Sequence, residues 1–380
     1  MNEPLAVDAH LAESGGPVVA VLGGGQLGRM LGLAGLPLGV TTRFLDPAPD
    51  ATARTIGTLV VGALDDVEAV ARVARDASVV TYEWEGVPAA SARSITGCDV
   101  RPGPRALEIA QDRLAEKEAF TRLGIAAARH APIDTVEQLD AALEVTGLPA
   151  LLKTRRGGYD GKGQVLVFDD ATARAAWMQL GGVPLIAESV VEFTRELSVL
   201  AARAVDGTTA CYPLIENRHE RGILRTSRAP APGLTATLQH EGEALAERLL
   251  DDLDYVGVLA VELFERDGRL LANEIAPRVH NSGHWTIEGA DTSQFEQHLR
   301  AVLGWPLGSV EMVGRAAMVN CVGALPDRAA VLAVPGAHLH DYAKVARPGR
   351  KLGHVTVVAP DDSTLDERIA RVREVQRDDG

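Results

Sequence analysis

The sequence is poor in cysteine and contains no long apolar run. Its three cysteines, Cys98, Cys211 and Cys321, lie far apart and form no CxxC pair. This pattern excludes a disulfide framework and a cysteine zinc site, and it suits a reducing cytoplasm. No stretch is long and apolar enough to cross a membrane. The acidic residues 1–16 lack the basic region of a signal peptide, so we expect a loose leader there.

Positive charge is scarce as well. The chain has 38 Lys and Arg against 52 Asp and Glu, which gives a net charge of −14. This balance argues against a nucleic-acid surface, although it leaves local anion sites open. With 380 residues, 46% of them hydrophobic and 24% charged, the chain is long enough for two or three domains with cores of their own.

The most informative stretch is 257–285. VLAVELF and RLLANEI predict the strands of a hairpin around Arg266-Asp267-Gly268. With a two-residue loop, the acids Glu262 and Glu274 would point to opposite faces. We predict a three-residue loop, which makes them diagonal neighbours on one face. Two carboxylates there indicate a Mg²⁺-nucleotide site, because Mg²⁺ takes one or two carboxylates plus water and phosphates. A solvated sheet edge is the alternative.

The segment PRVHNSGHW after the hairpin is crowded with polar groups. A plain surface loop rarely needs so many, so this segment supports a functional site beside the two acids. The functional groups come from Arg278, His280, Asn281, Ser282 and His284.

The first domain opens with a buried strand, a GGGQLG turn and a helix. Three glycines, Gly23, Gly25 and Gly28, fit the pattern GxGxxG. Asp46 follows a second strand. This is the dinucleotide-binding fingerprint, but the same strand–turn–helix serves any ligand that presents an anion to a helix N-terminus. The strand SVVTYEW brings Glu83 and Glu85 to a strand end, where ligands bind in parallel sheets. Simple solvent exposure is the alternative for both acids.

Residues 106–124 show helical periodicity, and we place a domain boundary near 110–116. Arg113 and Lys117 lie four apart on this helix, where solvated surface is the default interpretation.

The stretch LPALLKTRRGGYDGKGQVLVF predicts a strand ending in Lys153, a glycine-rich loop and a returning strand. A strand–loop–strand order excludes a Walker P-loop, which runs into a helix. A mobile loop with backbone N–H groups and cations can instead close over phosphates. A flexible hairpin tip is the alternative. Beyond it, Glu188 and Glu196 flank a short connection, and after 311 short strands surround the basic segment RPGRKLGH.

This order of motifs resembles the ATP-grasp superfamily and, within it, the N5-carboxyaminoimidazole ribonucleotide synthetases. The resemblance spans about 17 to 358 and is carried by GGGQLGRML, TYEWE, KTRRGGYDGKGQ, NEIAPRVHNSGHWT and RPGRKLGH. One departure is Gly86 after TYEWE, where the family usually has Asn. The resemblance implies an α/β fold of ATP-grasp architecture. After the leader (1–16) it places a Rossmann-like pre-ATP-grasp domain (17–112), an ATP-grasp domain (113–310) with its lid within 155–164, and a small β-rich C-terminal domain (311–380).

The resemblance also implies a function. It is the ATP- and bicarbonate-dependent carboxylation of aminoimidazole ribonucleotide through carboxyphosphate, by a cytoplasmic homodimer that uses Mg²⁺, or Mn²⁺ in its place, and neither NAD nor biotin. The implied metal ligands are Glu262 and Glu274. The implied ATP-binding residues are Arg113, Lys153, Gly158, Tyr159, Asp160, Gly161, Lys162, Gly163, Gln164, Glu188, Ser189, Val190, Val191, Glu196, His219, Asn273 and Glu274. The implied catalytic residues are Tyr159, Asp160, Lys162, Arg278, His280 and Asn281. The ribonucleotide is expected at Gly25, Gln26, Leu27, Glu83, Lys344, Arg350 and Lys351.

Other functions remain as alternatives. A formate-using glycinamide ribonucleotide transformylase and a biotin carboxylase share the ATP-grasp order, but the HNSGHW segment argues against both. A nicotinamide oxidoreductase would use the N-terminal glycines, and a non-catalytic module would bind nucleotide without turnover. Either Asp160 or His280 is a candidate for the base that takes the proton from the substrate amine.

Overall fold

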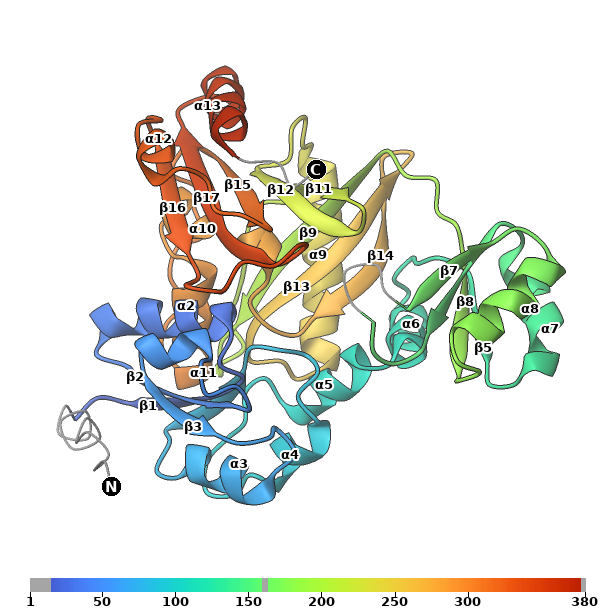
Figure 1. Cartoon of the computed structure of the whole chain (residues 1–380), viewed down its shortest axis with the longest axis horizontal. Coiled ribbons are helices and arrows are strands. Elements are labelled where there is room, and N and C mark those ends of the chain that lie inside the picture. The colour runs from blue at the N-terminus through green and yellow to red at the C-terminus, as the bar shows by residue number, and fades with distance from the viewer. Residues whose placement is uncertain (1–14, 159–162, 377–380) are drawn as a thin grey trace.

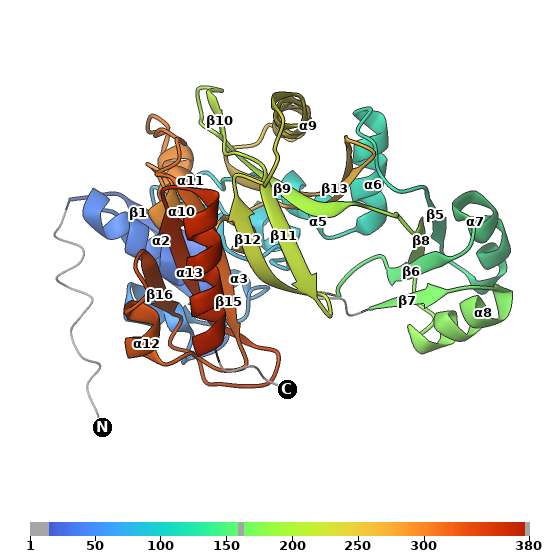
Figure 2. The same ribbon diagram turned by 90° about the horizontal axis from the view of Figure 1, so that it is seen from above.

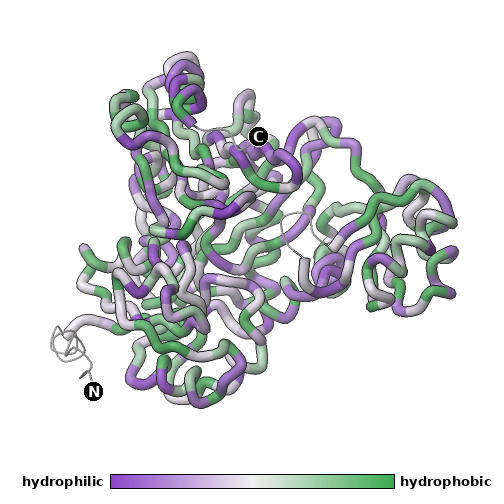
Figure 3. The backbone as a smooth tube through the Cα atoms, in the orientation of Figure 1, coloured by the Kyte–Doolittle hydropathy of each residue, from purple (hydrophilic) through white to green (hydrophobic). Residues whose placement is uncertain are grey.

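The computed structural model describes residues 15–158 and 163–376 of the chain. They form three β-sheets with helices packed on them. Figure 1 shows a long central sheet whose one end is formed by the red C-terminal strands, with the blue N-terminal part beside that end and a smaller green unit beyond the other end. Hydrophobic stretches occur in all three parts (Figure 3), in keeping with separate buried clusters in each.

The N-terminal sheet is parallel, with strand order β3-β2-β1-β4. Its strands are β1 (Val18–Leu22), β2 (Thr41–Asp46), β3 (Thr58–Val61) and β4 (Val79–Tyr82). The helices of this part are α2 (Gln26–Gly35), α3 (Val67–Ala74) and α4 (Ala89–Ser94). Every residue of β4 is buried, as expected for a parallel strand covered on both faces. The predicted Rossmann-like topology is confirmed.

The segment predicted as one long helix folds as two. They are α5 (Pro104–Ala110) and α6 (Arg113–Arg122), and Asp112 is the N-cap of α6. The Asp112 side chain accepts from the N–H of Leu114 and pairs with Arg155 at 2.7 Å. A cap that also binds the start of the glycine-rich loop therefore ends one helix and begins the next.

The small green unit is a four-stranded antiparallel sheet of order β5-β8-β6-β7. Its strands are β5 (His130–Ile133), β6 (Ala150–Thr154), β7 (Gln164–Val167) and β8 (Leu185–Ser189). Both helices of the unit, α7 (Leu139–Thr146) and α8 (Asp170–Gln179), lie on its outer side (Figure 2). The other face is left toward the central sheet.

The central sheet has nine strands in the order β14-β13-β9-β11-β12-β15-β17-β16, with β10 beside β9. The first half consists of β9 (Arg195–Arg203), β10 (Thr209–Cys211), β11 (Ile215–Glu220), β12 (Ile223–Ala229), β13 (Gly257–Arg266) and β14 (Arg269–Ala276). The second half consists of β15 (Arg315–Val322), β16 (Ala337–Asp341) and β17 (Lys351–Ala359). The two halves join through the antiparallel pairing of β12 with β15.

Helices cover this sheet on both sides. They are α9 (Ala236–Asp252), α10 (Thr286–Gly289), α11 (Gln294–Leu303), α12 (Arg328–Leu332) and α13 (Asp362–Val375). The N-terminal sheet shares one buried cluster with α11 and the central sheet, so these parts pack as one body. Among the described residues, no helix is both long and apolar enough for a membrane span.

Candidate functional site

The hairpin β13–β14 turns more tightly than predicted. Arg266 pairs with Arg269, so only Asp267 and Gly268 form the loop, and both have positive φ as a type I′ turn requires. The predicted three-residue loop is therefore wrong. A β-bulge after Glu262 compensates: Asn273 is the extra residue, and Glu262 pairs directly with Glu274. The two carboxylates therefore face the same side of the sheet, as predicted, but the cause is the bulge and not a three-residue loop.

The surroundings shift the pKa values of these two acids in opposite directions. Burial raises the pKa of Glu262, but the hydrogen bond from His280 and nearby positive charge, including that of Lys351, outweigh it, and the pKa falls to about 2. Burial and the repulsion from Glu262 raise the pKa of Glu274 to about 7. The pKa values of the two acids are thus moved apart, and Glu262 is the more readily ionised. A divalent cation between them would favour both charges, and carboxylate oxygens are the donors Mg²⁺ prefers, so the pair fits that ion.

Cations from the small sheet reach the same acids. Lys153, at the end of β6, lies 2.9 Å from Glu188 at the end of β8, and its charge also lowers the pKa of Glu274. Burial raises the pKa of Glu188, but the charges of Lys117 and Lys153 outweigh this effect and lower the pKa overall. This carboxylate is therefore ionised.

Lys117 is a residue of this site that the sequence did not reveal. Its side chain is 2% exposed, so the expected solvated position on the helix is wrong. The ammonium group donates to the carbonyl of Asn273 and lies 4.0 Å from both Glu116 and Glu188. Its spacing of one helical turn from Arg113 was the available signal. Lys117 thereby links the bulge between the two acids to the Lys153–Glu188 pair.

Arg113 and the glycine-rich loop are held together. Arg113 donates to the carbonyls of Thr154 and Gly157 at 2.7 Å each, and to that of Gly158 at 3.2 Å. Across the loop, Gly163 has a positive φ and Gln164 pairs with Lys153 in the β6–β7 ladder. The predicted loop residues Tyr159, Asp160, Gly161 and Lys162 lie outside the described residues.

The connection from β8 to β9 holds the other predicted nucleotide residues. The backbone of Ser189 bonds Arg129, and Val190 and Val191 follow it without strand pairing. Glu196 accepts from the Nδ1 of His219 at 2.7 Å. Burial lowers the pKa of His219, yet the bond to Glu196 raises it overall. The Phe193 ring stacks on Phe264, with centroids 4.6 Å apart, and the sequence gave no sign of this stack.

The residues expected in the carboxylation pocket already have partners. Arg278 is buried and pairs with Glu85, and burial of that acid raises its pKa less than Arg278 lowers it. His280 presents Nε2 to Glu262 at 3.2 Å. Asn281 exchanges two amide hydrogen bonds with Asn320, at 2.6 and 3.2 Å. These three residues therefore each have a partner within the protein.

The predicted ribonucleotide residues meet at the start of α2. The N–H groups of Gly25 and Gly28 each donate to the carboxylate of Glu83 at 2.7 Å. Burial raises the pKa of Glu83 against these bonds. The helix N-terminus is therefore occupied by a carboxylate of the protein itself, which leaves it unsuited to a dinucleotide pyrophosphate.

Asp46 is used in the same way, since it accepts from the N–H groups of Gly24 and Ala48 at 2.8 Å each. A ribose hydroxyl, which this acid would bind in a dinucleotide fold, would have to compete with both donors. Gly86 packs beneath the Trp84 ring, so any side chain at this position would meet the indole.

The basic residues of the C-terminal segment approach the start of α2. Lys344 donates to Gln26, and burial followed by the charge of Arg350 lowers its pKa to about 8. The charge of Lys351 acts on Glu262 and His219, so it lies near the acidic pair. Leu27, in contrast, is buried in the core and offers only its backbone.

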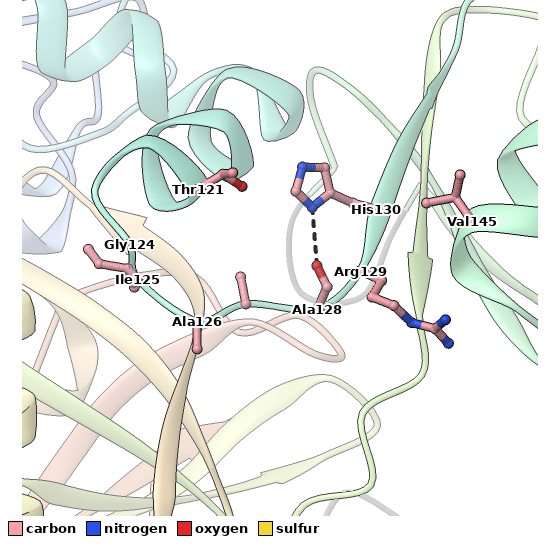
Figure 4. Close-up of a pocket in the computed structure, with 9 residues that line it drawn as sticks. Thr121, Gly124, Ile125, Ala126, Ala128, Arg129, His130 and Val145 are labelled. Atoms are coloured by element: carbon pink, nitrogen blue, oxygen red, sulfur yellow. Dashed lines mark hydrogen bonds between the residues drawn. The ribbon is translucent and has the colours of Figure 1, made fainter.

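One hollow of the described surface lies away from these residues. A depression of about 530 Å³ lies where the chain leaves α6 for β5 (Figure 4), and Val145 of α7 closes one side. Its lining is mostly small side chains, and His130 there hydrogen-bonds the carbonyl of Ala128 at 3.1 Å. It contains none of the predicted site residues.

Comparison with known proteins covers most of the chain. Residues 17–111 match the ribonucleotide synthetase preATP-grasp domain, 118–295 the ATP-grasp domain and 316–368 the phosphoribosylaminoimidazole carboxylase C-terminal domain. The N5-carboxyaminoimidazole ribonucleotide synthase of Pseudomonas aeruginosa is 51% identical over 359 residues, which are 93% of this chain and 98% of that protein. The synthase of Brucella melitensis is 45% identical over 91% of this chain and 97% of its own length.

Solved structures agree. The N5-carboxyaminoimidazole ribonucleotide synthetase of Thermus thermophilus is 53% identical, with a TM-score of 0.92 over 95% of this chain and 99% of that one. The synthase of Aspergillus clavatus, solved with ADP and aminoimidazole ribonucleotide, is 33% identical, with a TM-score of 0.87 over 95% of this chain and all of that one. The predicted ATP-grasp architecture, with its N-terminal and C-terminal parts, is confirmed.

Proposed function

This chain belongs to the N5-carboxyaminoimidazole ribonucleotide synthase family, and on that premise we propose how its residues divide the work. The protein is a carbon–nitrogen ligase of purine biosynthesis that uses ATP to carboxylate aminoimidazole ribonucleotide. The observation that carries the residue assignment is the direct pairing of Glu262 with Glu274, within reach of the charge of Lys153.

The chemical problem is the inertness of bicarbonate. Its carbon is shielded by an oxyanion, so the substrate amine cannot attack it at neutral pH. Attack of bicarbonate on the γ-phosphate of ATP makes carboxyphosphate, in which phosphate is a good leaving group. Catalysis of such a phosphoryl transfer consists mainly of positioning and charge neutralisation.

The nucleotide would lie between the small sheet and the central sheet. Arg113 and Lys153 would contact its phosphates, and the loop from Gly158 to Gln164 would close over them and exclude water. Exclusion of water matters because carboxyphosphate hydrolyses quickly. The segment from Glu188 to Val191 would read adenine, and Glu196 with His219 would meet the ribose. The ion pairs Lys153–Glu188 and Glu196–His219 support this placement, because they hold these groups in fixed positions.

Glu262 and Glu274 would hold Mg²⁺ or Mn²⁺, with Asn273 beside them. When bound, the cation neutralises the charge that develops on the phosphates. Their direct pairing and the raised pKa of Glu274 support this role, since a cation between them would relieve the repulsion of the two carboxylates. Lys117 would fix the bulge at Asn273 and so hold both acids in register.

Arg278, His280 and Asn281, together with Tyr159, Asp160 and Lys162, would form the carboxylation pocket. Arg278 already binds the carboxylate of Glu85, so its planar guanidinium suits a second planar anion such as bicarbonate. The substrate amine then takes the carboxyl group from carboxyphosphate or from released CO₂ and loses a proton.

The ribonucleotide would lie between the start of α2 and the C-terminal basic segment. Gly25, Gln26 and the backbone of Leu27 would face it together with Glu83, and Lys344, Arg350 and Lys351 would bind its phosphate. The contact between Lys344 and Gln26 supports this arrangement, because it brings the C-terminal basic segment to the start of α2.

We also propose the remaining features of the family for this chain. The domains would divide at 112 and 310, with the leader before residue 17. The enzyme would work in the cytoplasm as a homodimer, and the three free cysteines accord with a reducing compartment. Light scattering during size-exclusion chromatography would test the dimer.

The decisive experiment measures ADP release from MgATP and bicarbonate with and without aminoimidazole ribonucleotide. We expect strong stimulation by the ribonucleotide in the wild type and its loss in Glu274→Gln. Asp267→Asn is the matched control, because it removes a charge from the exposed turn of the same hairpin. Stimulation by glycinamide ribonucleotide with formate instead would contradict the substrate assignment. Equal rates in wild type and Glu274→Gln would contradict the metal role.

A further inference from the structure

A chain of buried hydrogen bonds leads from the interior of the central sheet to His280. Ser227 of β12 donates to the amide oxygen of Asn217 on β11 at 2.7 Å, and the amide nitrogen of Asn217 donates to Ser198 of β9 at 2.9 Å. Ser198 donates to the hydroxyl of Ser282 at 2.9 Å. All four side chains are buried, so no bulk water competes for these bonds.

The hydrogen bonds of this series run in one direction, because each hydroxyl has only one proton to donate. Ser198 gives its hydroxyl proton to Ser282, so Ser282 accepts from that side and has its own proton to give elsewhere. Its remaining neighbour is the Nδ1 of His280, at 2.9 Å. Donation from Ser282 to Nδ1 completes the series.

A second, longer contact favours the same tautomer of the ring. The backbone N–H of Ser282 points at Nδ1 of His280 at 3.3 Å, because His280 caps the short helical turn Asn281–Gly283. A backbone N–H can only donate, so Nδ1 must present its lone pair. The proton of the ring then resides on Nε2, which faces Glu262 at 3.2 Å.

The backbone of His280 is held as firmly as its ring. Gln294 accepts from the N–H of His280 at 2.9 Å and donates to its carbonyl at 2.7 Å. The backbone of His280 is therefore held at both polar groups, and both ring nitrogens have partners within the protein.

We propose that the buried chain Ser227–Asn217–Ser198–Ser282 sets the tautomer of His280, so that its Nε2–H is a standing donor to Glu262. His280 is then a positioning residue that orients a metal-binding carboxylate, and it is not the base that takes the proton from the substrate amine. Hydrogen-bonded partners of metal ligands commonly act in this way. The proposal rests on the proposed function in one respect, which is the role of Glu262 as a metal ligand.

The protein contains its own reference for this arrangement. The fully buried His298 accepts from the N–H of Val258 at Nδ1, 3.1 Å away, and its Nε2 lies 2.8 Å from the hydroxyl of Thr81. The two rings have the same pattern, a backbone N–H on Nδ1 and an oxygen at Nε2, but His298 has no part in the proposed site.

The test is a long-range ¹H–¹⁵N NMR spectrum of the full-length protein labelled at its ten histidines. His280→Gln and His298→Gln assign the two rings by the signals that disappear. We expect both rings to carry the proton on Nε2. In Ser282→Ala and Ser198→Ala the pattern of His280 should move toward a mixture of tautomers while that of His298 stays unchanged.

The same variants give a binding readout. The Mg²⁺ dependence of ADP binding, measured by calorimetry, should weaken about 10-fold in Ser282→Ala and less in Ser198→Ala. Thr81→Val is the matched control, because it removes a buried hydroxyl from the other histidine and should leave both His280 and the Mg²⁺ dependence as in wild type.

A wild-type spectrum with the proton of His280 on Nδ1 would overturn the proposal, and this measurement needs no variant to fold. So would Mg²⁺ dependences equal to wild type in both serine variants. Neither readout requires turnover, so a failed ADP-release assay would refute the proposed substrate without affecting this result.

Discussion

Glu116 is a buried acid beneath the proposed nucleotide site, and its replacement by glutamine should stabilise the protein at alkaline pH. One carboxylate oxygen accepts from the N–H of Ile275 at 2.7 Å, next to Glu274, and the other lies 4.0 Å from Lys117. The amide of Glu116→Gln can accept from the same N–H, so the variant keeps the bond and loses only the ionisable group.

The magnitude follows from the pKa of Glu116. Burial raises it from 4.5 to about 8, against the charge of Lys117. The folded protein therefore keeps a proton over a range in which the unfolded chain has lost it, so the wild type loses stability as the pH rises from 4.5 to about 8. The shift of 8 − 4.5 = 3.5 units bounds this loss at about 5 kcal/mol, since each unit corresponds to about 1.4 kcal/mol.

The assay is calorimetric unfolding of wild type and Glu116→Gln at pH values from ~5 to ~9. We expect equal melting temperatures at the acidic end and a gain for the variant of up to roughly 6 °C at the alkaline end, taking an unfolding entropy of about 2.1 cal/mol/K per residue. Glu118→Gln is the control, because it makes the same change at an exposed position of the same helix. Parallel pH profiles for wild type and Glu116→Gln would refute the reasoning.

Three further predictions concern ligands. The pKa of Lys344 is lowered to about 8, so the KM for aminoimidazole ribonucleotide should rise as the pH passes 8 and the charge is lost. Lys344→Arg should abolish this rise in initial-rate profiles. A profile of the variant equal to that of the wild type would contradict the binding of the substrate phosphate by Lys344. Phe193→Ala removes the stack on Phe264, worth about 0.5–1.5 kcal/mol, and should raise the KM for ATP by roughly 2–10-fold with little change for the ribonucleotide. Equal effects on both KM values would contradict a role of this stack in the ATP site. Lys117→Met removes a buried cation beside Glu188 and the donor to the carbonyl of Asn273, and should cost about 3–5 kcal/mol in thermal or urea unfolding, whereas a loss below ~1 kcal/mol would show that Lys117 is dispensable.

Much of the site could be predicted because its motifs are local. The strand-ending Lys153, the acids of the hairpin and the glycine-rich loop each follow from the residues on either side. The order of these motifs along the chain was sufficient for the family and for the ATP-grasp architecture.

What could not be predicted depends on contacts between distant segments. The bulge at Asn273 leaves no sign in the sequence, so the correct facing of Glu262 and Glu274 was reached through the wrong loop. Lys117 has the spacing of an ordinary surface residue, and only the packing of α6 against β14 buries it.

The glycine turn before α2 is a second case in which a contact with a distant segment could not be predicted. GxGxxG predicts an anion at the start of α2, and an anion is there, but it is Glu83, 58 residues away from Gly25. A local pattern defines the type of interaction, while the partner is set by the strand order β2-β1-β4.

The pairing of β12 with β15 has a practical consequence for work with shortened chains. Four described residue pairs join the two halves of the central sheet there, from Thr226–Val319 to Ala229–Ala316. A chain truncated before Arg315 would leave β12 as a bare edge strand that is ready to pair with a second molecule. Removal of the C-terminal strands should therefore produce aggregation during expression before it produces an inactive monomer. Any dissection of this enzyme is better made at the small sheet, which joins the rest of the chain through loops and α6.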